Sequence, residues 1–382
     1  MTLAVGVVGA SARAAAGSLV RAGFAAWAVD LFADRDLKQV ASCVRCPADR
    51  YPAALPELAE QFPPGPVIYT GGLENHPDVV RELSARRELW GSSPEVLERV
   101  RDPLALNAAL SAANLPSPAV LPTTTPPSVG RWLRKPLRSA GGHAIRFANP
   151  SDPPSTSAFL QEFIDGASMS ALFVTKLEGI VLIGITEQLV GEPWLHAKSF
   201  AYCGNIGPIL PPMPLHIALE RTAGAIAQAT GLRGIWGMDF ILRDGVPFPV
   251  EVNPRYTAAA EVLELGTGVK VLLVHADCFP APRPDRMKTS RVFRSFIGKA
   301  IYFAPHRITF PPSGRWDADL CGEFDPWRLP GFADIPEASE VIEPGWPVLT
   351  FFATGSTPDE CRKRLQSRAA ELDQLFARDP HP

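Results

Sequence analysis

The first thirty residues constrain the fold more than any other stretch of the chain. Residues 3 to 8 (LAVGVV) form a continuous apolar run, Gly9 and Ser11 follow, and an alanine-rich segment ends near Gly23. A second apolar run, AAWAVDL, comes next. A strand, a glycine turn, a helix and a second strand within about 30 residues predict a βαβ unit, and therefore a parallel sheet.

The glycines of this turn do not have the spacing of a dinucleotide site. That site uses the pattern G-x-G-x-x-G, in which closely spaced glycines let the backbone approach a pyrophosphate. Here the glycines fall at positions 6, 9 and 17. The spacing disfavours binding of NAD.

The composition indicates a globular protein. The chain has 382 residues, of which 46% are hydrophobic, which is enough for two or three domains with well-formed cores. Because the formal net charge is only −3, neither a nucleic acid nor an anionic membrane has electrostatic support as a partner. Any phosphate site must therefore be local.

The chain lacks the usual signals for export, membrane insertion or metal-binding cysteines. Its apolar start has no basic segment of the kind that opens a signal peptide, and no later apolar run approaches the roughly 18 to 20 residues that cross a bilayer. We expect a cytoplasmic location. Cys43 and Cys46 form a C-x-x-C without a second pair or a nearby histidine cluster, so we expect ordinary reduced thiols.

The segment FPVEVNPRY (248–256) places two oxygen-bearing side chains on one face of an apolar strand. Side chains alternate along a strand, so Glu251 and Asn253 share a face while Val250 and Val252 point the other way. Such a pair suits a hard cation. The alternative is a half-buried strand whose solvated face carries an acid and an amide.

Two further segments have the character of a nucleotide site. In RWLRKPLRSAGGHAIRFA (131–148), Lys135 ends a strand and a small flexible loop follows, which lets backbone N–H groups approach a phosphate. In FLQEFIDG (159–166), a short apolar connector beside an acid could supply backbone groups and apolar walls to a base. The alternatives are an ordinary hairpin and an ordinary strand and turn.

Taken in order, these segments resemble the ATP-grasp superfamily, and within it the carboxylate–amine ligases distantly related to biotin carboxylase. The resemblance covers nearly the whole chain. It rests on GVVGASARAAAGSLVRAGFAAWAVD, GSSPEVLERVRDP, KPLRSAGGH, QEFIDG, GMDFILRDGVPFPVEVNPR and ADIPEASEVIEPGWPVLTFFATG.

The resemblance implies an α/β ATP-grasp fold with three parts. Residues 1–92 would form a Rossmann-like pre-ATP-grasp domain. Residues 93–280 would form the ATP-grasp domain, whose two α+β subdomains clamp ATP and hold the metal. Residues 281–382 would form a small C-terminal α+β extension.

The resemblance also implies the site residues, in three sets. The nucleotide set is Lys135, Ser139, Gly141, Gly142, Gln161, Glu162, Phe163, Ile164 and Ser168. The metal set, for Mg²⁺ with Mn²⁺ as an alternative, is Asp239, Glu251 and Asn253. The catalytic set is Lys135, Arg255, Glu251 and Asn253. By the same resemblance, Lys135 would hold the α- and β-phosphates, and Arg255 would face the transferring phosphate.

Two positions depart from the pattern of many relatives. Pro103 follows Asp102 where those relatives carry a lysine or arginine, so a phosphate-binding cation is missing or is replaced by Arg101. Ser168 stands where they carry the acid that binds the ribose.

A metal site on this hairpin also makes a geometric demand. Asp239 must lie on the same face as Glu251 and Asn253. A two-residue turn at Asp244 and Gly245 would place Asp239 on the wrong face, whereas a three-residue loop over 243–245 would place it opposite Pro249. We therefore expect the three-residue loop.

The resemblance implies an ATP-dependent, ADP-forming ligase. A substrate carboxylate would attack the γ-phosphate, and an amine would displace phosphate from the resulting acyl phosphate. No covalent enzyme nucleophile is needed. Relatives of this kind suggest small-molecule substrates, such as glutamate with tyramine or tyrosine, in the biosynthesis of methanofuran- or methanopterin-type one-carbon carriers, and a homodimer is compatible with the resemblance.

The substrate-binding residues are harder to assign. The candidates lie in EQLVGEPWLHAKSFAYCGNIGPI and are Glu187, Gln188, His196, Tyr202 and Asn205, each of which could instead be strand surface. Two other functions stay open. One is a non-catalytic, ATP-binding regulatory or scaffold module, and the other is a carboxylase similar to biotin carboxylase.

Overall fold

The computed structural model describes residues 2–125, 129–280, 293 and 295–377. Its N-terminal part is a four-stranded parallel sheet in the order β3-β2-β1-β4. The strands are β1 (Ala4–Gly9), β2 (Ala25–Asp30), β3 (Ser42–Arg45) and β4 (Val67–Tyr69). The helical segments around them are α1 (Arg13–Arg21), α2 (Leu37–Val40), η1 (Ala48–Arg50), α3 (Leu55–Ala59), η2 (Leu73–Asn75) and α4 (Pro77–Arg86).

The predicted βαβ unit is confirmed. β1 and β2 run parallel in register from Ala4 opposite Ala25 to Gly9 opposite Asp30, and α1 connects them. The apolar run of β1 is buried, as expected for a parallel strand covered on both faces. The alanine-rich sequence of α1 lets the helix pack closely, with Ala15 and Leu19 in the core.

Two helices, α5 (Pro94–Val100) and α6 (Pro103–Ala112), lead to the rest of the chain. The Asp102 carboxylate caps α6 by accepting hydrogen bonds from the backbone N–H groups of Leu104 at 3.1 Å and Ala105 at 3.0 Å. Pro103 occupies the start of the helix, where no backbone N–H is needed. The Asp-Pro pair therefore has a structural role at a position where the resemblance implies a cation.

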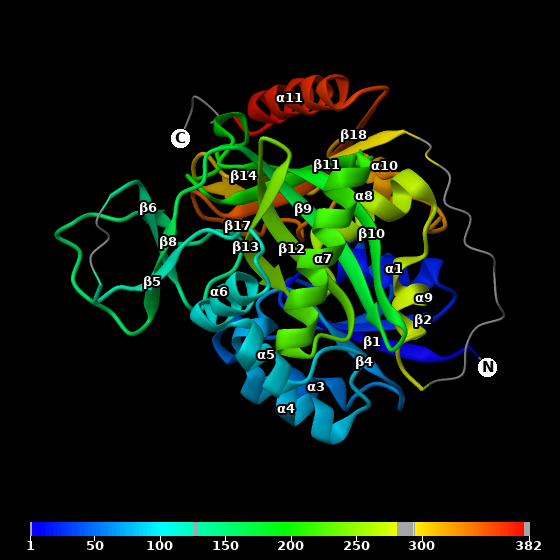
Figure 1. Ribbon diagram of the computed structural model, residues 1–382. Coiled ribbons are helices and arrows are strands. Elements are labelled where there is room, and N and C mark those ends of the chain that lie inside the picture. The colour runs from blue at the N-terminus through cyan, green and yellow to red at the C-terminus, as the bar shows by residue number, and fades with distance from the viewer. Residues whose placement is uncertain (1, 126–128, 281–292, 294, 378–382) are drawn as a thin grey trace.

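A small antiparallel sheet projects from the body of the molecule, at the left of Figure 1. Its order is β5-β8-β6-β7, with β5 (Val120–Pro122), β6 (Trp132–Pro136), β7 (Arg146–Phe147) and β8 (Ala158–Glu162). The expected strand, loop and strand over 131–148 are β6 and β7, which pair with each other.

The largest sheet has eight strands, all paired antiparallel, in the order β13-β12-β9-β10-β11-β14-β18-β16. These strands are β9 (Ala167–Lys176), β10 (Gly179–Val190), β11 (Tyr202–Ile209), β12 (Gly234–Arg243), β13 (Val246–Asn253), β14 (Phe296–Phe303), β16 (Phe332–Ala333) and β18 (Pro347–Gly355). The remaining elements are η3 (Pro193–Leu195), α7 (Met213–Thr230), α8 (Ala258–Thr267), α9 (Val271–Ala276), β15 (Ile308–Thr309), α10 (Asp317–Leu320), β17 (Val341–Ile342) and α11 (Pro358–Leu375).

Helices cover both faces of this sheet, so the side chains of its central strands are buried in alternation. Phe173 of β9 belongs to the core that includes residues of α7, whereas its neighbours Leu172 and Val174 belong to the core shared with α1 and α8. The sequence of residues 215–230 predicts an amphipathic helix closed by Gly231, and these residues lie in α7, which ends at Gly231 in a left-handed conformation. No helix among the described residues is long and apolar enough to span a bilayer.

The division of the chain at 92/93 and 280/281 stays a prediction. Strands from the expected second part (β9 to β13) and third part (β14, β16 and β18) belong to one continuous sheet. The boundary at 280/281 adjoins residues 281–292, which lie outside the described part of the chain.

The expected three-residue loop between β12 and β13 was wrong. Arg243 pairs with Val246, so the turn consists of Asp244 and Gly245, with φ angles of 53° and 77° that suit a tight hairpin. The register then shifts at a β-bulge, because Phe240 lies opposite Pro249 but Asp239 lies opposite Glu251. Val250 is the extra residue. The bulge, rather than a longer loop, brings Asp239 onto the face of Glu251.

Candidate active site

A cavity of about 700 Å³ lies between the small sheet and the eight-stranded sheet. Most of the predicted site residues line it: Lys135, Gly141, Gly142, Gln161, Glu162, Phe163, Ile164, Ser168, Asp239, Glu251, Asn253 and Arg255. Ser139 lines an adjoining pocket of about 90 Å³, which shares Lys135, Gln161 and Glu251 with the larger cavity. The structure therefore brings together residues from segments more than 100 positions apart.

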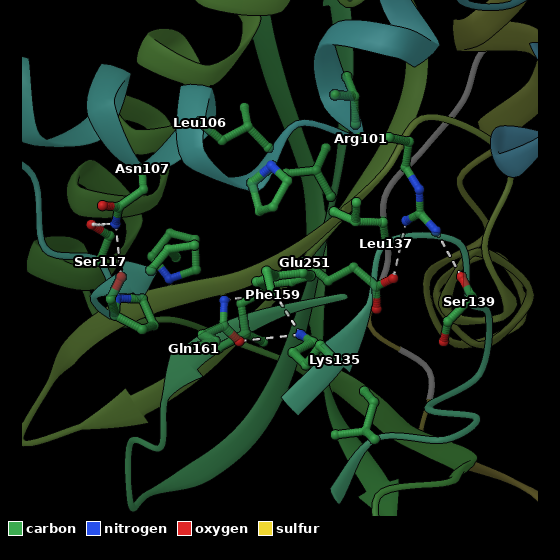
Figure 2. Close-up of a pocket in the computed structure, with 18 of the residues that line it drawn as sticks. Arg101, Leu106, Asn107, Ser117, Lys135, Leu137, Ser139, Phe159, Gln161 and Glu251 are labelled. Atoms are coloured by element: carbon green, nitrogen blue, oxygen red, sulfur yellow. Dashed lines mark hydrogen bonds and ion pairs between the residues drawn. The ribbon is translucent and has the colours of Figure 1, made fainter. Parts of the chain in front are cut away.

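Lys135 is a buried cation whose hydrogen-bond partners are neutral. It lies on β6 and is 9% exposed. Its Nζ donates to Gln161 Oε1 at 3.1 Å and to the carbonyl oxygen of Val250 at 3.0 Å (Figure 2). Burial lowers the pKa of Lys135, although the charges of Glu251 and Asp239 oppose this shift. An ammonium group with this surrounding would be stabilised by an anionic ligand.

Ser170, Asp239 and Glu251 form a row across three neighbouring strands, because Asp239 of β12 lies opposite both Ser170 of β9 and Glu251 of β13. Asp239 accepts hydrogen bonds from Ser170 Oγ at 2.8 Å and from Asn253 Nδ2 at 3.2 Å. Burial, together with the nearby charge of Glu251, raises the pKa of Asp239 to about 6.

The two carboxylates of this row, together with the neighbouring Asn253, fit a hard divalent cation. Asp239, Glu251 and Asn253 offer carboxylate and amide oxygens, the donor set that Mg²⁺ and Mn²⁺ prefer. A cation between the two carboxylates would relieve the repulsion that raises the pKa of Asp239. In the described part of the chain no group of three or more His, Cys, Asp and Glu side chains could hold a metal ion. A site here would therefore combine the two carboxylates with a ligand of another type, and Asn253 is the predicted one.

Arg101, at the end of α5, lies beside the predicted metal ligand Glu251. Its Nη1 is 3.4 Å from Glu251 Oε1, and its Nη2 donates to the carbonyl oxygen of Ser139 at 2.7 Å and to Asn75 Oδ1. Figure 2 shows Arg101 and Lys135 on either side of Glu251. The structure therefore places Arg101, a second cation, near Lys135, although the residue at position 103 is a proline.

Arg255 joins the N-terminal part of the chain to the cavity. Its Nε donates to Glu74 Oε1 at 3.0 Å, and its Nη2 is 3.3 Å from Asn253 Oδ1. Glu74, in η2, is 1% exposed. Burial alone would raise the pKa of Glu74, but the charge and hydrogen bond of Arg255, together with a backbone hydrogen bond and the charge of Arg101, outweigh it and lower this pKa. Sequence reasoning did not find Glu74, because nothing near it in the sequence indicates that Arg255 is its partner.

The glycine loop after β6 packs against the start of β11 and the residues just before it. Gly141 accepts a hydrogen bond from the backbone N–H of Tyr202 at 3.0 Å. At Gly142, with φ of +78°, a Cβ would lie 1.8 Å from the carbonyl oxygen of Phe200. Only glycine can occupy this position, so the loop can lie directly over the cavity.

The connector after β8 forms an apolar wall of the cavity. The rings of Phe163 and Phe147 are 5.3 Å apart, and the Arg131 guanidinium stacks on both of them. The Glu162 carboxylate accepts a hydrogen bond from the backbone N–H of Ala119 at 3.1 Å. Phe163 N–H is also engaged, donating to the carbonyl oxygen of Arg131 at 2.8 Å. The two rings meet edge to face, at an interplanar angle of 60°, and offer apolar surface to a planar base.

The predicted substrate residues divide into two groups. Gln188, Tyr202 and Asn205 line the cavity. Glu187 instead pairs with Arg362 at 2.6 Å, and His196 pairs with Asp373 at 2.6 Å, both with α11. Ser170 was missed, although its spacing of two residues from Ser168 places both on one face of β9.

All six cysteines are free thiols.

Comparison with known proteins identifies the fold. A family model described as an ATP-grasp domain matches residues 100–259. The chain is 26% identical over 227 residues to an uncharacterized protein of Methanocaldococcus jannaschii, covering 58% of this chain and 50% of that protein. It is 27% identical over 248 residues to the carbamoyl phosphate synthase large chain of Beutenbergia cavernae, covering 56% of this chain and 22% of that one. The chain thus spans half or less of these relatives.

Solved structures agree over the whole chain. The L-amino acid ligase of Bacillus licheniformis superposes with a TM-score of 0.69 at 15% identity, covering 97% of both chains. The biotin carboxylase domain of Hydrogenobacter thermophilus 2-oxoglutarate carboxylase, solved with MgADP, superposes with a TM-score of 0.68 at 14% identity, covering 96% of this chain and 89% of that one. The protein has the ATP-grasp fold, as its sequence predicted.

Proposed function

We propose that the protein is an ATP-dependent, ADP-forming carboxylate–amine ligase. The observation that carries this proposal is the convergence of buried Lys135 with the facing carboxylates Asp239 and Glu251 in one cavity. The similarity to an L-amino acid ligase and to a structure that holds MgADP supports it.

In this proposal Lys135 and Arg101 bind the phosphates of ATP, and the Phe163 wall packs against its base. Asp239, Glu251 and Asn253 hold Mg²⁺, or Mn²⁺ in its place, which supplies charge neutralisation at the phosphates. Arg255, held by Glu74 at 3.0 Å, faces the phosphoryl group that moves to the substrate carboxylate. The catalysis required is positioning and electrostatic stabilisation.

The acid and the amine are small molecules that reach the cavity wall at Gln188, Tyr202 and Asn205. Glutamate with tyramine or tyrosine, joined during the biosynthesis of a one-carbon carrier, is the pair we propose. A cytoplasmic location and a homodimer belong to the same proposal.

A screen for ADP and phosphate release tests the function. Purified protein with Mg-ATP should release ADP only when a suitable acid and amine are both present, and the thermal unfolding midpoint should rise with Mg-ATP alone. No midpoint shift at millimolar nucleotide would contradict the ATP site. A shift without ADP release from any pair of acid and amine would instead support a non-catalytic ATP-binding module.

A further inference from the structure

A second cavity, of about 370 Å³, lies where the N-terminal part of the chain meets β14, β17 and β18. Ser11, Phe32 and Asp34 form one wall, and the facing wall includes Ile301, Asp334 and Leu349. It shares no lining residue with the candidate active site. Its volume lies within the range of cavities that bind small organic molecules, about 300 to 1,000 Å³.

The lining of this second cavity is mainly apolar and acidic, with Ser11 and Thr350 as its other polar residues. Phe32, Ile301, Val348 and Leu349 contribute hydrocarbon surface, and Trp346 contributes its indole ring. The ionisable residues that line it are Asp34, Asp334, Glu340 and Glu343, with no lysine or arginine among the lining residues. The chemistry of the surface therefore suits a ligand that is apolar and positively charged.

Three of the four acids already have a cationic partner outside the lining. Asp334 pairs with Arg13 at 2.9 Å, Glu340 with Arg45 at 2.8 Å, and Glu343 with Arg307 at 3.4 Å. Asp34 is the exception. Asp34 is only 8% exposed, yet its side chain makes no hydrogen bond or ion pair with any described residue.

Among the described residues no cation forms an ion pair with Asp34. Arg13, whose charge acts on Asp34, is held by Glu261 at 2.9 Å through Nη2 and by Asp334 at 2.9 Å through Nε. Burial, with the charges of Asp334 and Asp36, raises the pKa of Asp34 well above its ordinary value, and Arg13 only partly opposes this. A cation in the cavity would remove this cost.

We propose that this cavity binds an organic ammonium ion, with the ammonium group against Asp34 and an apolar body against Phe32, Ile301 and Leu349. The site goes beyond the proposed ligase reaction, because an amine held here is not in the cavity where an acyl phosphate would form. The ion pairs from Lys299 through Glu261 to Arg13 and Asp334 connect the two cavities, since Lys299 lies opposite Asn205 of the active site.

Titration calorimetry of the full chain with benzylamine tests this site, with benzyl alcohol as the neutral ligand of nearly the same shape. We expect saturable binding of benzylamine at neutral pH and binding of benzyl alcohol at least tenfold weaker. Asp34→Asn should weaken benzylamine binding at least tenfold but leave the thermal shift with Mg-ATP unchanged. Asp49→Asn, at an exposed position, should bind benzylamine like the parent.

Two further readouts place the ligand. The indole N–H resonance of Trp346, identified with Trp346→Phe, should shift on titration with benzylamine, because Trp346 lines the cavity. Mg-ATP should not displace benzylamine. Displacement by Mg-ATP, equal binding of amine and alcohol, parental binding by Asp34→Asn, or no saturable binding at millimolar benzylamine would each overturn the proposal.

Discussion

The Nζ of Lys135 lies 3.0 Å from the carbonyl oxygen of Val250, the extra residue of the β-bulge in β13. The bulge has two effects. It turns Asp239 to face Glu251 across the hairpin, and it provides the acceptor that fixes Lys135 next to them. One irregularity in the strand therefore sets the position of the predicted metal ligands relative to the predicted phosphate-binding lysine.

Lys135→Met should strongly weaken nucleotide binding without unfolding the protein. Methionine fills a similar volume and removes a buried ammonium group that has only neutral acceptors, so we expect stability to change by no more than about 1 kcal/mol. The affinity for Mg-ATP, measured by calorimetry, should fall at least a hundredfold. Lys363→Met, at an exposed position, is the matched control. Parental affinity in Lys135→Met would mean that the lysine only supports the bulge.

Arg101→Gln tests whether Arg101 supplies the cation that Pro103 lacks. The guanidinium lies 3.4 Å from Glu251 and is tied to Ser139 of the glycine loop at 2.7 Å. We expect at least a tenfold loss of affinity for Mg-ATP, smaller than that of Lys135→Met, and little change in thermal unfolding without ligand. Arg50→Gln, in an exposed ion pair, should behave like the parent. An unchanged affinity in Arg101→Gln would show that Arg101 serves only to hold the loop.

The local patterns of the sequence were enough to predict the βαβ start, the helix ending at Gly231 and the strand and loop elements that line the cavity, because each follows from runs of neighbouring residues. The register of the β12–β13 hairpin was not predictable in this way. Val250 has the same apolar, β-branched character as Val246 and Val252 of the same strand, and its carbonyl oxygen at the bulge accepts a hydrogen bond from Lys135, 115 positions away. A sequence pattern carries no mark of such a contact.

The same reasoning explains why Glu74 was missed and why the position of Arg101 was not foreseen, although Arg101 itself was named as a possible replacement cation. Glu74 reaches Arg255 across 181 positions, and Arg101 reaches Glu251 across 150. Both contacts depend on how the N-terminal part packs against the large sheet. The fold could be inferred from motif order, whereas the partners of the charged residues required the tertiary structure.

Glu251→Gln removes one negative charge from the predicted metal site and keeps the shape of the side chain. If Glu251 helps to hold the metal at the transferring phosphate, the loss of transition-state stabilisation should be on the order of several kcal/mol, roughly a thousandfold or more in rate. ADP release by parent and variant, followed across a magnesium titration with the substrates from the screen, measures this. Glu178→Gln, in an exposed turn, is the control. A parental rate and magnesium dependence in Glu251→Gln would exclude Glu251 from the metal site.

His275 makes the stability of the protein depend on pH. It is 1% exposed, its Nδ1 accepts the backbone N–H of Ile235 at 2.8 Å, and its Nε2 lies 3.2 Å from the carbonyl oxygen of Trp90. A neutral ring with its proton on Nε2 satisfies both contacts. Burial lowers the pKa of His275 to about 4.

A lowered pKa in the folded state means that the unfolded chain binds this proton more readily. The contribution of neutral His275 is therefore fully present above the unfolded pKa, about 6.5, and is lost as the pH falls towards 4, by roughly 3 kcal/mol at most. The free energy of unfolding, measured with urea, should fall more for the parent than for His275→Gln between pH 7 and pH 4.5. The difference in free energy of unfolding could instead stay constant over this range, and the ring could titrate near 6.5 by NMR in the folded parent. Together these results would mean that His275 is accessible to protonation. The neutral ring would then not connect α9 to β12 and Trp90.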